Sequence, residues 1–154
     1  MSQMAEVTVE ETSIKHLDRL YEIEMECFEK EAFTRQQIAY LLTDYDSVSL
    51  IARVNGEIIG FTIGKICLDG KSAIGHILTI DVSPKHRRRG IGLKLLQNIE
   101  KMFKCKGVKV CCLEVREDNI AALNLYQKFG YKKVGRLENY YGNAHGAYLK
   151  KVLT

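Results

Sequence analysis

The stretch Asp81-Val-Ser-Pro-Lys-His-Arg-Arg-Arg-Gly-Ile-Gly92 joins a strand to a helix through a basic turn. The apolar run that ends at Val82 predicts the strand. Apolar residues then recur at spacings of four, four and three, at Ile91, Leu95, Ile99 and Met102. Those spacings place them on one face of a helix. The first turn of a helix has unpaired N–H donors and a partial positive charge, so this corner can bind a phosphate group.

The composition of the corner supports such a site. Three consecutive arginines, Arg87, Arg88 and Arg89, add fixed positive charge, and a guanidinium binds phosphate oxygens as a fork. The stretch is not a Walker loop, because no Gly-Lys-Ser/Thr closes it. It is also a poor dinucleotide fingerprint, since Leu95 stands where the third glycine should be. Two interpretations remain at this point, a phosphate site and a basic turn that caps a surface helix.

Length and composition limit the class of protein. The 154 residues are predicted to form one domain spanning 1–154. No apolar run approaches the ~20 residues of a membrane span, and the N-terminus lacks the regions of a signal peptide. We therefore expect a cytoplasmic protein with no membrane partner. The five cysteines form no Cys-x-x-Cys pattern, so we expect free thiols and no metal site.

The first third of the chain predicts one strand and two helices. Alternation over 5–11 predicts the strand. Apolar residues at helical spacing then predict a first helix that ends near Cys27, and they are Ile14, Leu17, Tyr21 and Met25. Its acidic residues Glu22, Glu24 and Glu26 are expected on a solvated face. Thr34 and Gln37 form a capping box for the second helix.

The remaining two thirds predict a mixed sheet. Strands at 47–54, 57–68 and 73–82, with Asn55-Gly56 between the first two, predict an antiparallel meander. The run 108–115 is almost continuously apolar, which is typical of a parallel strand buried on both faces. A helix from Asp118 or Asn119, with Leu125 among its inward residues, and strands at 131–139 and 147–153 complete the chain. The fold class is therefore α/β, with about seven strands, antiparallel first and parallel in the centre, and about four helices.

Several stretches resemble one known family. Arg87-x-x-Gly90-x-Gly92 resembles the pyrophosphate signature of the GCN5-related N-acetyltransferases (GNAT), which bind acetyl-CoA. The stretch from Leu113-Glu-Val-Arg116 to Phe129-Gly-Tyr131 is similar to the second half of that family's cofactor core, and also to the ribosomal-protein alanine acetyltransferases. Gly75-His-Ile77 and Asn139-Tyr-Tyr-Gly142 are similar to protein N-terminal acetyltransferases, including the archaeal and NatA-type catalytic subunits. The resemblance covers residues 47–153 well and implies a single GNAT-like domain.

The resemblance implies where acetyl-CoA, the only cofactor we expect, would bind. The pyrophosphate would lie on the amides of 87–92, and the pantetheine arm along the strand that ends at Val82. Asn119 would contact the cofactor from the next helix, although it could also simply cap that helix. The expected cofactor-binding residues are Ile80, Asp81, Val82, Arg87, Arg88, Arg89, Gly90, Ile91, Gly92, Lys94, Asn119 and Tyr126.

Three residues are candidates for catalysis. Glu114 is the one carboxylate in the most apolar strand, where it would be a better proton acceptor at neutral pH. It could instead pair with a cation such as Arg116 or Lys109. His76 could hold a water between the amine and Glu114, or be a satisfied core histidine. By resemblance, Tyr126 would protonate the departing thiolate; otherwise it is a packed core tyrosine.

The substrate is expected to be a protein or peptide N-terminus, including those of ribosomal or nascent proteins. An α-amino group has a pKa near 7.7–8.0 and a lysine near 10.4, so a modest base suits N-termini better. The candidate groove residues are Phe28, Glu31, Tyr140 and Tyr141. Two alternatives stay open, a lysine or small-amine acetyltransferase and, more remotely, a basic nucleic-acid-binding module. The accepted first residue and the oligomeric state are left open.

Overall fold

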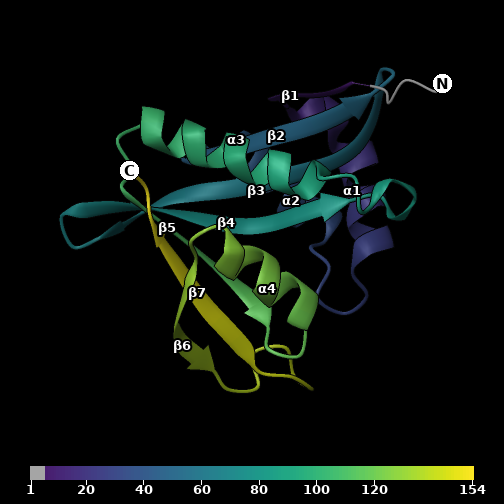
Figure 1. Cartoon of the computed structure of the whole chain (residues 1–154). Helices are drawn as coiled ribbons and strands as arrows, with labels where there is room; N and C mark the ends of the chain where they lie inside the picture. The colour runs from purple at the N-terminus through teal and green to yellow at the C-terminus, as the bar shows by residue number, and fades with distance from the viewer. Residues whose placement is uncertain (1–5) are drawn as a thin grey trace.

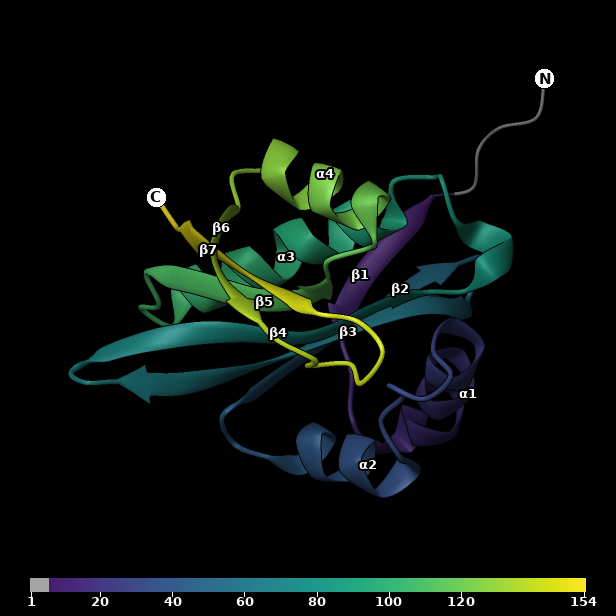
Figure 2. The ribbon, with the colours of Figure 1, turned by 90° about the horizontal axis from the view of Figure 1, so that it is seen from below.

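The chain folds as one seven-stranded mixed sheet with two helices on each face (Figures 1 and 2). The computed structural model describes residues 6–154, so the predicted strand start at residue 5 lies outside the described part. The strands are β1 (Val7–Glu11), β2 (Ser47–Val54), β3 (Glu57–Asp69), β4 (Ser72–Val82), β5 (Val110–Arg116), β6 (Lys132–Leu137) and β7 (Gly146–Val152). The helices are α1 (Leu17–Cys27), α2 (Arg35–Thr43), α3 (Ile91–Cys105) and α4 (Ile120–Lys128). The predicted fold class is confirmed.

The helices divide the core into two parts. Figure 2 shows α1 and α2 on one face of the sheet and α3 and α4 on the other. The α3 stripe behaves as predicted, because Ile91, Leu95 and Ile99 are all buried against the sheet. The capping box of α2 is also confirmed, with the Thr34 side chain and the Gln37 amide each bonded to the other's backbone N–H. None of the helices within residues 6–154 is long and apolar enough to cross a membrane.

The sheet order is β1-β2-β3-β4-β5-β7-β6, and its one parallel junction joins β4 to β5. That junction is short, because only Ile74, Gly75 and His76 of β4 pair with β5. Beyond His76 the two strands diverge (Figure 1). On its other edge β5 pairs with β7 over its whole length. Residues 77–82 of β4 therefore present a backbone edge toward β5 that is free of strand partners.

The sheet is closely packed at the junction and irregular just beyond it. Phe103 of α3 is fully buried against two glycines, where an added Cβ would lie 2.5 Å from its ring at Gly75 and 2.6 Å at Gly64. Two residues further along, the β3–β4 ladder has a bulge, since Ile63 pairs with Thr79 whereas Gly64 pairs with Ile77. A bulge leaves one residue without a partner and bends its strand. Leu78 is that residue, and it lies where β4 begins its free edge.

Two sequence expectations about helix faces are wrong. The buried residues of α1 are Leu17, Leu20, Ile23 and Glu24. Ile14 and Met25, predicted to face inward, are exposed instead. In α4, Leu125 was expected inside and is 39% exposed. The short helix α4 lies over the edge of the core and buries none of its residues fully.

Candidate active site

A cavity of about 630 Å³ occupies the space where β4 and β5 diverge. Its walls come from β4, β5, the start of α4, the loop between α1 and α2, and the loop between β6 and β7. Nine of the predicted site residues line it, and they are Phe28, Glu31, His76, Ile80, Glu114, Asn119, Tyr126, Tyr140 and Tyr141. Residues from five separate segments are thus brought to one place.

His76 and Glu114 meet on the wall of this cavity. The His76 Nε2 lies 2.6 Å from Glu114 Oε2 and 3.0 Å from Oε1. The contact spans the parallel junction, because His76 is the last β4 residue that pairs with β5. Neither side chain is fully buried, so the pair stays accessible from the cavity. The partner of Glu114 is therefore a histidine in direct contact, rather than Arg116 or Lys109.

Tyr126 of α4 lies on another wall of the same cavity. Its ring packs edge-on against Tyr131, with centroids 5.8 Å apart. The Tyr131 hydroxyl donates to Glu100 over 2.7 Å, and Lys151 holds Glu100 from the other side at 2.8 Å. Burial and the negative charge of Asp81 raise the pKa of Tyr126 to about 12. The Tyr126 phenol is consequently protonated, and able to donate a proton, throughout the neutral range.

The basic corner lies at the far end of the β4 free edge. Gly90 is the N-cap of α3 with φ of +76°, and no side chain caps the helix. Arg88 also has a positive φ of +65°, so the turn is held in a left-handed conformation at two positions. Arg87 Nε donates to the Val82 carbonyl over 3.2 Å. An uncapped helix start beside exposed arginines fits the diphosphate of acetyl-CoA.

The other predicted cofactor residues lie at this corner, outside the cavity lining. Asp81 and Val82 end β4, Ile91 and Gly92 begin α3, and Arg89 is exposed between them. The Lys94 ammonium donates to the carbonyl of Val7, so its side chain extends toward β1.

Asn119 combines the two roles that the sequence left open. Its Oδ1 accepts from the Ala122 N–H over 3.1 Å and caps α4. The side-chain NH₂ group of a capping asparagine is not used by the cap and keeps two donors. Because Asn119 also lines the cavity, that group can donate to a bound molecule while the cap is intact.

Two buried carboxyl groups next to the cavity, those of Glu24 and Asp81, were not predicted as a pair from the sequence. Glu24, expected on a solvated face, is 1% exposed and lines the cavity. Its Oε2 accepts from the Phe33 N–H over 2.9 Å, and Thr79 Oγ1 donates to its Oε1 over 3.4 Å and also to Asp81. Burial and the neighbouring Glu24 carboxyl raise the pKa of Asp81 well above its usual range. The signal was available, because Glu24 lies four residues after Leu20 on the buried face.

The candidate groove residues line the cavity from two loops. Tyr140 and Tyr141 pack edge-to-face with ring centroids 4.9 Å apart. Burial, with a smaller effect of Glu114, raises the pKa of Tyr140. A second, more open hollow of about 540 Å³ runs along α2 and includes Tyr40. Phe33 and Leu78 line both spaces, so the hollow lies next to the cavity.

Comparisons with known proteins agree with this geometry. Residues 17–131 match the Acetyltransferase (GNAT) family, and the chain belongs to that family. It is 35% identical over 117 residues to the N-alpha-acetyltransferase of Sulfurisphaera tokodaii, a match that covers 70% of each chain.

Solved structures show the same fold. The ribosomal-protein-S18-alanine N-acetyltransferase of Escherichia coli has a TM-score of 0.87 at 23% identity, covering 97% of this chain and 95% of that one. Arabidopsis thaliana NAA60 in complex with acetyl-CoA has a TM-score of 0.85 at 23% identity, covering 96% and 99%. The protein is therefore an acetyl-CoA-dependent acetyltransferase, which confirms the family, fold and cofactor predicted from the sequence.

Proposed function

We propose that this acetyltransferase modifies the free α-amino group of protein or peptide N-termini. The observation that carries the proposal is the His76–Glu114 pair, which lies inside the cavity where the free edge of β4 begins. An amine that enters the cavity meets a proton acceptor there. An α-amino group near pKa 7.7–8.0 is already partly neutral at pH 7, so this pair needs to remove only the one proton that the nitrogen loses when the amide forms.

Two further observations favour N-termini over small amines. The Sulfurisphaera tokodaii relative is named an N-alpha-acetyltransferase, and the Escherichia coli structural neighbour is named a ribosomal-protein-S18-alanine N-acetyltransferase. The cavity also lies next to the hollow along α2, which a small amine would leave empty and an extended peptide could reach. Ribosomal or nascent proteins are the substrates we propose. The five free cysteines agree with a reducing compartment such as the cytoplasm.

The chain's own groups divide the work of binding. Acetyl-CoA supplies the acetyl thioester. The amides at 87–92 and the arginines of the corner would hold its diphosphate, and the β4 edge from Ile80 to Val82 would pair with the amide groups of its arm. Asn119 would donate from the other wall through its free NH₂ group. Backbone N–H groups along this edge of β4 would polarise the thioester carbonyl.

Two side chains would move protons. Glu114, in contact with His76, would accept the proton of the attacking amine as a general base. Tyr126, protonated because its pKa is near 12, would donate to the thiolate that departs. Phe28, Glu31, Tyr140 and Tyr141 would line the path of the peptide at the opening.

The test is an acetyl-transfer assay with a panel of acceptors. N-terminal peptides that vary only at the first two positions are compared with lysine peptides blocked at the N-terminus and with free amines. We expect transfer to free N-termini. For Glu114→Gln we expect kcat to fall at least ~100-fold, the usual scale of general-base catalysis. The KM for acetyl-CoA should be unchanged, and the exposed control Glu57→Gln should behave as wild type. Transfer to lysine side chains or free amines alone would refute the proposal.

A further inference from the structure

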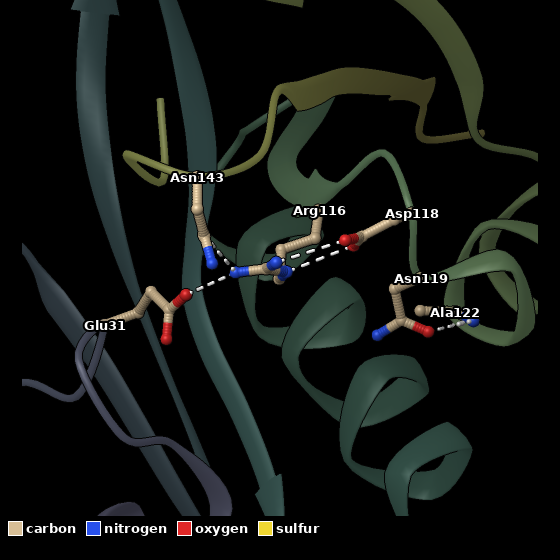
Figure 3. A network of polar contacts seen from close by, with 6 residues as sticks. All are labelled: Glu31, Arg116, Asp118, Asn119, Ala122 and Asn143. Carbon is tan, nitrogen blue, oxygen red and sulfur yellow. Dashed lines mark hydrogen bonds and ion pairs between the residues drawn. The ribbon is translucent and has the colours of Figure 1, made fainter. Parts of the chain in front are cut away.

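Arg116 lies at the end of β5 and contacts three other segments of the chain (Figure 3). Its Nε and Nη2 donate to the two carboxylate oxygens of Asp118, each over 3.1 Å. Its Nη1 donates to Glu31 Oε1 over 2.6 Å and to Asn143 Oδ1 over 3.3 Å. Glu31 belongs to the loop between α1 and α2, and Asn143 to the loop between β6 and β7.

These contacts use nearly all of the donors of the guanidinium. An arginine has five N–H donors in a rigid planar fork. Four of them are engaged with Asp118, Glu31 and Asn143. The hydrogen bond to Asp118 is the main cause that raises the pKa of Arg116, and it lowers the pKa of Asp118 in turn. A guanidinium with one donor left is poorly suited to bind a substrate anion, so its contacts are better explained as structural connections.

The connections join two loops that line the cavity. Glu31 and Tyr141 line the cavity from the two loops, and Arg116 lines it between them. The Arg116 guanidinium also lies over the Tyr141 ring, 5.8 Å from its centroid. The fork to Asp118 fixes the orientation of the guanidinium, and Nη1 then reaches both loops. Loops with few buried contacts open easily, so a shared anchor of this kind determines how well the groove is formed.

We propose that Arg116 is a positioning residue that holds the α1–α2 loop and the β6–β7 loop together across the peptide groove. The inference rests on the proposed function, because it assigns the groove to a peptide. The role requires the planar fork and not the charge alone. An ammonium is a compact point charge, which cannot hold both oxygens of Asp118 and also reach Glu31 and Asn143.

The experiment compares steady-state kinetics of Arg116→Lys and Arg116→Met with wild type on one N-terminal peptide. We expect the peptide KM to rise roughly tenfold in both variants, the scale of one lost charged hydrogen bond, with kcat within about twofold. The matched control is Arg53→Lys. Arg53 has a similar side-chain exposure, 27% against 31%, and pairs with Glu10 at the β1–β2 edge of the sheet. The control should keep the wild-type KM. A wild-type peptide KM in Arg116→Lys would overturn the proposal.

A double-mutant cycle separates positioning from direct binding. Glu31→Gln alone should also raise the peptide KM, but combined with Arg116→Met the total rise should stay near the larger single effect, because both changes remove one bridge. Multiplicative effects, about 100-fold in total, would mean that the two residues act independently, and would overturn the proposal.

Hydrogen exchange tests the bridge without any substrate. In Arg116→Met, amides of residues 28–33 and 139–145 should exchange about tenfold faster than in wild type, while those of β2 and β3 are unchanged. Unchanged exchange in both loops would overturn the bridge. This readout also distinguishes the two proposals, because a wild-type enzyme that acetylates no N-terminal peptide would refute the function while the exchange result still tests the bridge.

Discussion

Substitution of Gly75 by alanine should destabilise the protein through a single steric contact. A Cβ at this position would lie 2.5, 2.7 and 2.7 Å from three ring atoms of Phe103. Carbon atoms in contact prefer ~3.5–4.0 Å, so the ring or the strand must move by about 1 Å. Phe103 is fully buried and has no free space to enter. Overpacking of this kind costs ~1–3 kcal/mol, and in a protein of this size about 2 kcal/mol lowers the Tm by ~4–8 °C.

Thermal unfolding of Gly75→Ala, measured by circular dichroism, checks this magnitude. The matched control is Gly135→Ala on β6, where the nearest atom to an added Cβ is 3.9 Å away and no loss of Tm is expected. The double variant Gly75→Ala/Phe103→Leu should have a higher Tm than Gly75→Ala alone, because the smaller side chain relieves the overlap. A Tm for Gly75→Ala equal to that of wild type would refute the packing argument.

Three further predictions concern ionisable groups. Tyr126→Phe should lower kcat at least ~100-fold, by a factor that is constant from pH 6 to 10, since the phenol titrates only near pH 12; a factor that shrinks above pH 8 would contradict this. The Tm of Asp81→Asn, measured relative to that of wild type, should rise as the pH is raised from 4 to 8. The folded carboxyl keeps its proton above its usual pKa of 3.8, whereas the unfolded one loses it, so the wild type alone loses stability on that path; equal pH profiles would refute it. Glu24→Ala should lower the Tm and raise the peptide KM, and the exposed Glu22→Ala should do neither.

The order of elements was predictable because local patterns and topology agree along most of the chain. The turn after Val54, the continuous apolar run of β5 and the stripe on α3 each have one structural solution. The right-handed crossover from β4 through α3 to β5 then places the two strands side by side. This adjacency explains why Glu114 and His76, 38 residues apart in sequence, could both be nominated from sequence alone.

The direct contact between them could not be predicted, since it depends on register. His76 pairs with Cys112 in the ladder, and Glu114 lies two residues further along β5, so its side chain is on the same face as that of Cys112. Only at the last paired position can the two side chains meet in an accessible cavity. A longer junction would close the cavity, and a shorter one would separate the pair. The pairing ends just before the bulge at Leu78, and no periodic pattern in the sequence predicts the position of a bulge.

Glu24 shows why the largest error about the site was made on α1. Two apolar stripes are available on this helix, one through Tyr21 and Met25 and one through Leu20 and Ile23, and only the second is fully buried. Glu24 is buried on that stripe, and its carboxylate accepts a hydrogen bond from the Phe33 N–H. Phe33 lines both the cavity and the outer hollow. Alanine at this position would leave that partly buried N–H without its acceptor, at a cost of about 1 kcal/mol. Because Phe33 lines the groove, the same loss should weaken peptide binding, whereas Glu24→Gln keeps an acceptor oxygen and should bind peptide nearly as wild type does. If Glu24→Ala lowered the Tm but left the peptide KM unchanged, Glu24 would support the fold alone, and the Phe33 wall would not belong to the peptide path.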